Sequence, residues 1–282
     1  MSFEPQQMQP SDTATRVLVL MYHRVGESVN AWEQRYCVEP SRFAAHMRAL
    51  HKRGYRPVRD DDFFDWLAGR ASLPAQSFLL TFDDAFEGVF EHARPVLLKL
   101  GWTATVFAVS GRMGGDDAWD LQNNPAGRRH RLMTEAQVRT LAQEGFSIQS
   151  HSRLHRDLTA IPHAELRDEL AGSRAELQAL IGQPVRYLAY PFGQFNAEVQ
   201  AAAVAAGYCG AFSTKPGFNY RDADPLAALR LDVAGTDSAG ALVRKMRFGT
   251  NDGSYATTAR YLAGRIAVRA RLRPRRPPKL PH

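Results

Sequence analysis

The chain has 282 residues, of which 44% are hydrophobic, and it carries a net charge of +7. That length suits one α/β barrel or two small domains, and that composition is ordinary for a globular protein with a substantial core. Residues 254–282 hold eight arginines and lysines and no acid, so the preceding chain has a net charge of −1 (7 − 8). Nucleic-acid binding would therefore rest on this tail alone and is not expected.

The beginning of the chain carries no secretory signal pattern. Residues 1–15 are rich in Gln, Ser and Thr, contain Pro5 and Pro10, and are expected to be disordered. The apolar run Val17–Tyr22 is too short to span a membrane. Cys37 and Cys209 form no metal-type pair and fit a reducing compartment without a disulfide. We therefore expect a cytoplasmic protein.

Short apolar runs alternate with segments of helical periodicity along most of the chain. The expected strands lie at 17–22, 55–58, 78–82, 103–109, 146–150, 186–190, 208–212 and 229–233. The expected helices lie at 41–53, 61–69, 85–100, 134–144, 162–181 and 197–206. Such alternation predicts a parallel sheet that is closed or nearly closed. The predicted organisation is one α/β domain at 16–253, with a basic helix and tail at 254–282.

Two polar motifs follow two of the expected strands. Asp83 and Asp84 are adjacent, whereas His151 and His155 stand four residues apart. In parallel α/β folds, functional sites form at the carboxyl ends of the strands. Histidine nitrogen and aspartate oxygen bind Zn²⁺ readily, and three protein ligands leave a position open for water. The motifs therefore predict a divalent metal with one carboxylate left over as a base, which fits hydrolysis.

Each motif also has a structural interpretation. Asp83 and Asp84 could cap the following helix, because aspartate accepts hydrogen bonds from free N–H groups and suits the positive helix end. Two histidines at helical spacing, such as His151 and His155, could face solvent or each other. The position of both motifs directly after expected strands favours the metal site.

Four short segments together resemble a known family. TFDD at 81–84, EGFSIQSHSRLH at 144–155 and YPFG at 190–193 resemble the successive motifs of the polysaccharide deacetylases (carbohydrate esterase family 4, the NodB-homology domain). MYHRV at 21–25 is similar to the branch that acts on poly-N-acetylglucosamine and related exopolysaccharides. The resemblance covers roughly residues 16–235 and implies a distorted (β/α)7-type barrel.

The resemblance also implies roles for the polar residues. Asp84, His151 and His155 would bind the metal, most simply Zn²⁺, with Co²⁺, Ni²⁺ or Fe²⁺ as alternatives. Asp83 would be the general base. Tyr190-Pro191-Phe192-Gly193 would supply the Phe192 backbone N–H to the oxyanion, with the proline and glycine shaping the turn; its structural alternative is an ordinary turn at the end of a strand.

The third motif departs from the commoner family form. There an arginine two residues before the proline pairs with the base aspartate, but Ala189 occupies that position here. We expect Arg230, in a late strand segment with Asp232, to reach Asp83 instead. Arg230 and Asp232 could equally form an ion pair on the surface.

The general acid is predicted to be His23. The family usually places this histidine near the C-terminus, yet only His282 follows His163 here. The resemblance implies that this branch has moved the motif to the front by circular permutation, and an imidazole suits protonation of the departing amine. The structural alternative is a histidine that caps a strand and bonds to backbone.

The long break in the pattern at 110–133 contains Trp119 and Asp120. A loop this long is usually functional or disordered. The resemblance implies that Trp119 stacks on a sugar ring near the site, whereas Trp119 could also be a packing residue that pins the loop.

The predicted activity is removal of N-acetyl groups from an N-acetylhexosamine polysaccharide, or from its lipid-linked precursor, in exopolysaccharide synthesis. Deformylation of a sugar and hydrolysis of a cyclic amide would use the same motifs. From a different class, the chain could be a carbohydrate-binding relic, but such a protein has no use for the extra carboxylate of Asp83. The tail at 254–282 is expected to contact an anionic membrane at the inner face. The oligomeric state is left open.

Overall fold

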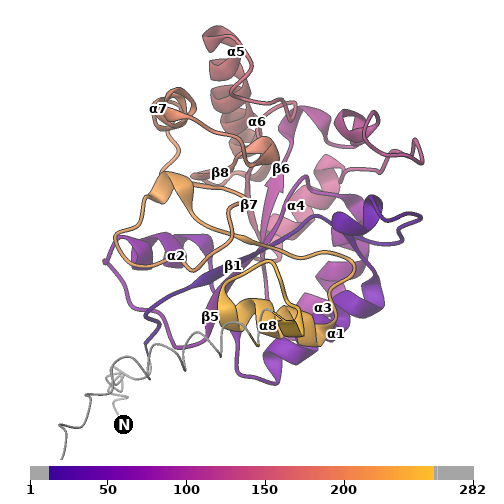
Figure 1. The fold of residues 1–282 in the computed structure, drawn as a ribbon. Helices are drawn as coiled ribbons and strands as arrows, with labels where there is room; N and C mark the ends of the chain where they lie inside the picture. The colour runs from indigo at the N-terminus through magenta and orange to yellow at the C-terminus, as the bar shows by residue number, and fades with distance from the viewer. Residues whose placement is uncertain (1–12, 257–258, 260–282) are drawn as a thin grey trace, which may run out of the picture.

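The computed structural model describes residues 13–256 and residue 259, and a parallel sheet forms the centre of this part of the chain (Figure 1). The strand order is β10-β1-β5-β6-β7-β8-β9, and β4 pairs with β5. The bounds are β1 Leu18–Tyr22, β4 Arg56–Pro57, β5 Ser77–Phe82, β6 Thr105–Ala108, β7 Ser147–Ser150, β8 Tyr187–Ala189, β9 Gly210–Phe212 and β10 Leu231–Asp232. Two short strands, β2 Arg24–Val25 and β3 Cys37–Val38, pair with each other outside this sheet.

The sheet curls into a distorted barrel, as predicted. Strand β1 lies between β10 and β5, because Leu20 pairs with Leu231 on one side and with Leu80 on the other. At the other edge, Phe212 of β9 forms a bridge to Ala228, three residues before β10. The segment from 228 to 232 therefore runs from the last strand of the sheet back to the first.

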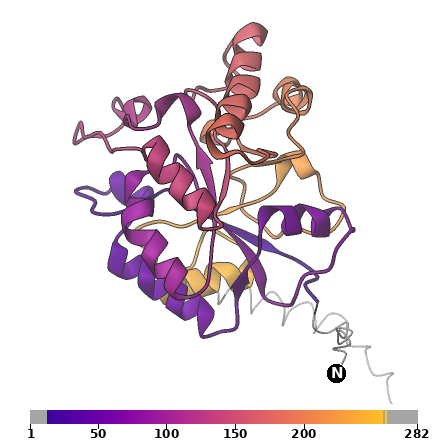
Figure 2. The ribbon, with the colours of Figure 1, turned by 180° about the vertical axis from the view of Figure 1, so that it is seen from behind.

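Helices surround the sheet, and the rear view shows the same arrangement (Figures 1 and 2). Their bounds are α1 Pro40–His51, α2 Asp60–Leu67, α3 Arg94–Lys99, α4 Glu135–Gln143, α5 His163–Arg167, α6 Ser173–Ile181, α7 Ala197–Ala205 and α8 Ala239–Phe248. Helix α4 begins with a capping box of Thr134 and Gln137. None of the described helices has the length and apolar character needed to cross a bilayer.

Two expected helices are less regular than their periodicity indicates. In the expected helix at 85–100, π-helical residues Val89–Ala93 precede α3. In the expected helix at 162–181, a π-helical turn at Asp168–Gly172 joins α5 to α6. The π-helix is rare and occurs mostly as single turns inside α-helices, and neither turn was predicted. Helix α8 was not among the expected helices.

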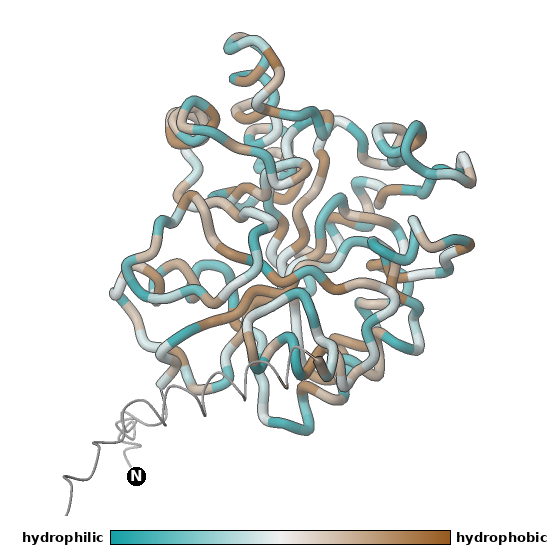
Figure 3. The backbone as a smooth tube through the Cα atoms, viewed as in Figure 1, coloured by the Kyte–Doolittle hydropathy of each residue, from teal (hydrophilic) through white to brown (hydrophobic). Residues whose placement is uncertain are grey.

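The apolar residues form two layers that leave one end of the barrel for polar chemistry. The most hydrophobic stretches coincide with central strands such as β1 (Figure 3). Alternate residues of the strands pack against the outer helices, whereas the others join a second cluster that includes Phe64 and Trp66 of α2. Asp60, at the start of α2, accepts a hydrogen bond from Ser147 at the beginning of β7 (2.5 Å). Helix α2 therefore covers the amino ends of the strands, and the carboxyl ends remain for the site.

The described chain is already packed at its first residues. Thr13 forms an antiparallel bridge with Pro74, and the backbone N–H of Ala14 donates to the Leu73 carbonyl (2.8 Å). Of the segment 1–15 that is expected to be disordered, residues 1–12 lie outside the described residues, as do residues 257–258 and 260–282 of the predicted basic helix and tail. The predicted domain boundaries therefore stay predictions.

Candidate metal centre and active site

Asp84, His151 and His155 converge at the carboxyl end of the sheet. Asp84 Oδ1 lies 3.5 Å from His151 Nε2 and 3.3 Å from His155 Nε2. All three residues are buried, and one potential ligand atom from each lies within 4.8 Å of the others. Asp84 follows β5 and His151 follows β7, two parallel strands on either side of β6, so both side chains emerge at the same edge of the sheet.

The donor set fits a divalent cation. Asp84 Oδ1 is buried and has no hydrogen-bond partner among the described residues, and a carboxylate in that position needs a compensating charge. Burial lowers the pKa of His151 and lowers that of His155 well below the usual range, so both imidazoles are neutral, as metal ligation requires. The Nδ1 of His151 hydrogen-bonds to the Ala189 carbonyl (2.8 Å), which directs Nε2 towards the centre.

The backbone around this centre is strained. Seven non-glycine residues in the described part have a positive φ, and five of them lie at the site: Asp84, Ala85, Ser152, His155 and Phe192. Left-handed conformations cost a residue with a Cβ about 1–2 kcal/mol each, and such residues cluster at functional sites. The fold therefore maintains an unfavourable local backbone where the ligands must converge.

Asp83 is held by Arg230. Nη1 of Arg230 lies 2.6 Å from Oδ1 of Asp83, and Nη2 lies 2.8 Å from Oδ2. Both residues are buried, and Arg230 Nε also donates to the Ser213 carbonyl (2.9 Å). Burial acts to raise the pKa of Asp83, but the charge of Arg230, the nearby His151 and His23 and the hydrogen bonds from Arg230 together outweigh it and lower the pKa to about 2. Asp83 is therefore an ionised carboxylate beside the three ligands, and Arg230 is not in a surface ion pair.

A cavity of about 330 Å³ lies at the candidate metal centre and is lined by Asp83, Asp84, His151 and His155. His23 and Asp232 line this cavity too. Burial lowers the pKa of His23 to about 4, and the nearby charge of Asp83 partly opposes this shift. His23 Nδ1 is buried and has no hydrogen-bond partner among the described residues. Burial raises the pKa of Asp232 to about 6. His23 therefore faces the cavity as a neutral imidazole. Asp232 takes up a proton more readily than an ordinary aspartate does.

The segment from Tyr190 to Gly193 forms one wall of the cavity. Phe192 has φ +56°, and its ring lies 4.6 Å from that of His155 in an edge-to-face arrangement. Gly193 has φ +68°, and a Cβ there would lie 2.1 Å from Thr214 Oγ1. The Tyr190 hydroxyl donates to the Leu226 carbonyl (3.0 Å). The turn is therefore a close-packed element that fixes the Phe192 backbone at the cavity.

Trp119 lies against the metal centre. Its ring stacks on His155, with centroids 4.4 Å apart and an interplanar angle of 20°. Trp119 and Phe192 thus pack on two parts of the same imidazole, and one face of Trp119 is occupied by protein. Asp120 lines the cavity, and burial followed by the charge of Asp117 raises its pKa to about 6.

Several residues that line the cavity were missed in the sequence. They are Met21, Arg24, Trp32, Tyr36, Phe86, Asp117, Thr214 and Asn251. Met21 and Arg24 belong to the MYHRV segment, but the other residues come from loops and turns that carry no recognisable spacing. Only the folded arrangement of those loops brings them to the site.

This fold and site define a family. Residues 70–211 match the sequence model of the polysaccharide deacetylases, and the chain belongs to that family. It is 29% identical over 226 residues to the Bacillus subtilis protein YxkH, which is assigned as a polysaccharide deacetylase, and the match covers 79% of this chain and 74% of YxkH.

Two further proteins are similar to this chain. The poly-β-1,6-N-acetyl-D-glucosamine N-deacetylase of Staphylococcus aureus is 22% identical over 216 residues, with coverage of 70% of this chain and 71% of the relative. The structure of the Streptococcus pyogenes deacetylase PplD has a TM-score of 0.70 at 22% identity and covers 82% of this chain and 98% of that one. The latter likeness shows a shared fold.

Proposed function

We propose that this protein hydrolyses N-acetyl groups of an N-acetylhexosamine polysaccharide or of its lipid-linked precursor and releases acetate. The observation that carries the proposal is the ionised Asp83, fixed by Arg230 beside three convergent ligands. A binding protein has no need for such a carboxylate. The family membership and the activity of the S. aureus relative support the choice of substrate.

Asp84, His151 and His155 would hold the cation, for which we propose Zn²⁺ because imidazole and carboxylate suit it. When bound, such an ion polarises an amide carbonyl and makes water more acidic. Asp83 accepts the proton of the attacking water, since its low pKa keeps it ionised and Arg230 fixes its orientation. The Phe192 N–H is the proposed donor to the oxyanion.

His23 is the proposed donor of a proton to the departing sugar amine. Its pKa of about 4 leaves it neutral in the resting protein, so in this role His23 first receives the proton that Asp83 takes from the water and then passes it to the amine. One water and one amide are consumed, and one acetate and one protonated amine are formed. The cavity position of His23 and its unpaired Nδ1 support this role.

We also propose that the protein works in the cytoplasm and contacts an anionic membrane through residues 254–282. The support is the sequence alone: eight basic residues, no acid and an apolar periodicity. The positions beyond 259 lie outside the described residues.

The proposal is tested by metal analysis of the purified protein followed by acetate release from a substrate panel. The panel contains β-1,6-linked N-acetylglucosamine oligomers, small cyclic amides and formamido sugars. Acetate release from the oligomers that stops after chelation and returns with Zn²⁺ supports the proposal. Release of formate alone would instead identify the protein as a deformylase. Ring opening of the cyclic amides alone would identify it as a cyclic-amide hydrolase.

A further inference from the structure

A chain of aromatic rings runs from His23 into the cavity. Tyr36 meets His23 edge to face with ring centroids 5.3 Å apart, and Trp32 meets Tyr36 in the same way at 5.4 Å. Both rings line the cavity. Neither Trp32 nor Tyr36 belongs to the two hydrophobic clusters of the described residues or packs against them. Their apolar surface is therefore not used to build the core.

Glu33, which lies between Trp32 and Tyr36 in the sequence, holds this segment in place. Glu33 is fully buried. Its Oε2 accepts from the Val29 backbone N–H (2.9 Å), and its Oε1 accepts from Nδ2 of Asn124 (3.0 Å). It also faces cationic groups of Arg24 at 3.8 Å and Arg128 at 3.7 Å. A buried carboxylate is tolerated only with such compensation, so the segment that carries Trp32 and Tyr36 has one well-defined position.

Glu33 joins this segment to the long loop at 110–133. His130 Nε2 lies 3.6 Å from Oε1 of Glu33. On its other side, His130 Nδ1 hydrogen-bonds to Asp117 at 2.9 Å. Asp117 stands two residues before Trp119, which covers the metal ligand His155. Two loops far apart in sequence are thus locked together, and the aromatic rings of both line one cavity.

We infer that Trp32 and Tyr36 form a subsite for a neighbouring sugar of a glycan chain, beside the sugar that is deacetylated. The inference rests on the proposed function. One face of Trp119 is taken up by His155, whereas Trp32 and Tyr36 are only partly buried and present ring surface to the cavity. The C–H face of a pyranose ring is apolar and suits such a surface, whereas its hydroxyls remain in the polar cavity. The ligand class is therefore an oligosaccharide of at least two linked hexosamines.

The test measures binding in an Asp83→Asn background, so that turnover does not consume the ligand. Calorimetry compares a β-1,6-linked N-acetylglucosamine pentamer with the monosaccharide. We expect the pentamer to bind more tightly than the monosaccharide, and Trp32→Ala to weaken pentamer binding about tenfold while monosaccharide binding changes less than twofold. Trp32→Phe retains a ring and is expected to retain most of the pentamer affinity.

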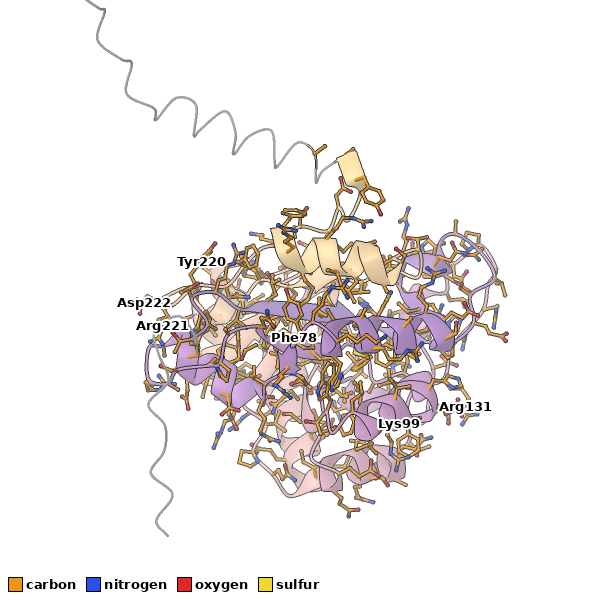
Figure 4. All side chains as sticks on the ribbon, turned by 90° about the horizontal axis from the view of Figure 1, so that it is seen from below. Phe78, Lys99, Arg131, Tyr220, Arg221 and Asp222 are labelled. Atoms are coloured by element: carbon orange, nitrogen blue, oxygen red, sulfur yellow. The ribbon has the colours of Figure 1, made fainter. Side chains whose placement is uncertain are left out.

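The control is Tyr220→Ala, which removes a 53% exposed aromatic side chain at the edge of the molecule, outside the cavity (Figure 4). It should leave both affinities unchanged. If the Asp83→Asn protein bound the pentamer and the monosaccharide with equal affinity, the subsite would be overturned. An equal loss of affinity for both ligands in Trp32→Ala would also overturn it. Failure of the subsite would appear in these binding measurements. Failure of the proposed activity would appear separately, as absence of acetate release by the wild-type protein.

Discussion

Arg230 donates two hydrogen bonds to Asp83 although 147 residues separate them, and both side chains are buried. Removal of one partner leaves the other as a buried, uncompensated charge. We expect Arg230→Met to lower the free energy of unfolding by about 3–5 kcal/mol. Urea denaturation in the presence of chelator measures this loss. The double variant Asp83→Asn with Arg230→Met should recover part of it, and a simple sum of the two single losses would contradict the coupling.

Metal content should distinguish the three proposed ligands from the proposed base. Asp84→Ala, His151→Ala and His155→Ala each remove one of three donors and are expected to yield protein with little bound metal. Asp83→Asn should retain the metal and lose turnover, because its carboxylate only moves a proton. Elemental analysis of the purified variants decides this. Metal-free Asp83→Asn beside metal-loaded, active Asp84→Asn would reverse the two assignments.

His23→Ala distinguishes a catalytic from a structural histidine. Loss of a general acid should lower turnover by about two to four orders of magnitude with metal content unchanged. Loss of a structural contact would instead lower thermal stability and leave the rate of the folded protein nearly intact. A stable, metal-loaded His23→Ala variant with a rate near wild type would rule out the acid role.

Gly193→Ala tests the turn that presents the Phe192 backbone. A Cβ at φ +68° costs about 1–2 kcal/mol from the backbone alone, and the contact with Thr214 adds to this cost. We expect lower thermal stability and lower turnover. Gly193→Ala with Thr214→Ala removes the two nearest atoms of Thr214 but leaves its Cβ at 2.8 Å and the backbone strain unchanged, so partial recovery of the melting temperature is expected. Full recovery would show that the left-handed φ is not required.

Residues 254–282 are expected to bind anionic vesicles at low salt. Near-surface basic residues contribute about 1 kcal/mol each, and the attraction is screened by salt. Sedimentation with phosphatidylglycerol vesicles compares the full chain with residues 1–253. Equal sedimentation of the two proteins would dispose of the membrane contact, and loss of the difference in high salt would identify it as electrostatic.

The barrel could be predicted because strand–helix alternation depends on local patterns. The convergence of Asp84, His151 and His155 followed from their positions after strands, since parallel strands share a carboxyl edge. Trp32 and Tyr36 could not be placed in the same way. Their position depends on Glu33, whose hydrogen-bond partner Asn124 lies 91 positions further along the chain. Such long-range packing of irregular segments leaves no periodic trace in the sequence.

The positive φ of Ala85 has a consequence for engineering. Asp84 and His155 must keep their side chains despite a left-handed backbone, but the methyl group of Ala85 carries no chemistry. Replacing it with glycine would relieve about 1–2 kcal/mol of left-handed strain without altering a ligand. The same change would cost about 0.4–1 kcal/mol through the freer unfolded chain, and about 0.8 kcal/mol through loss of a buried methyl group from the core. The strained alanine therefore costs the protein little, because the residue that adopts the left-handed backbone also fills the core beneath the site.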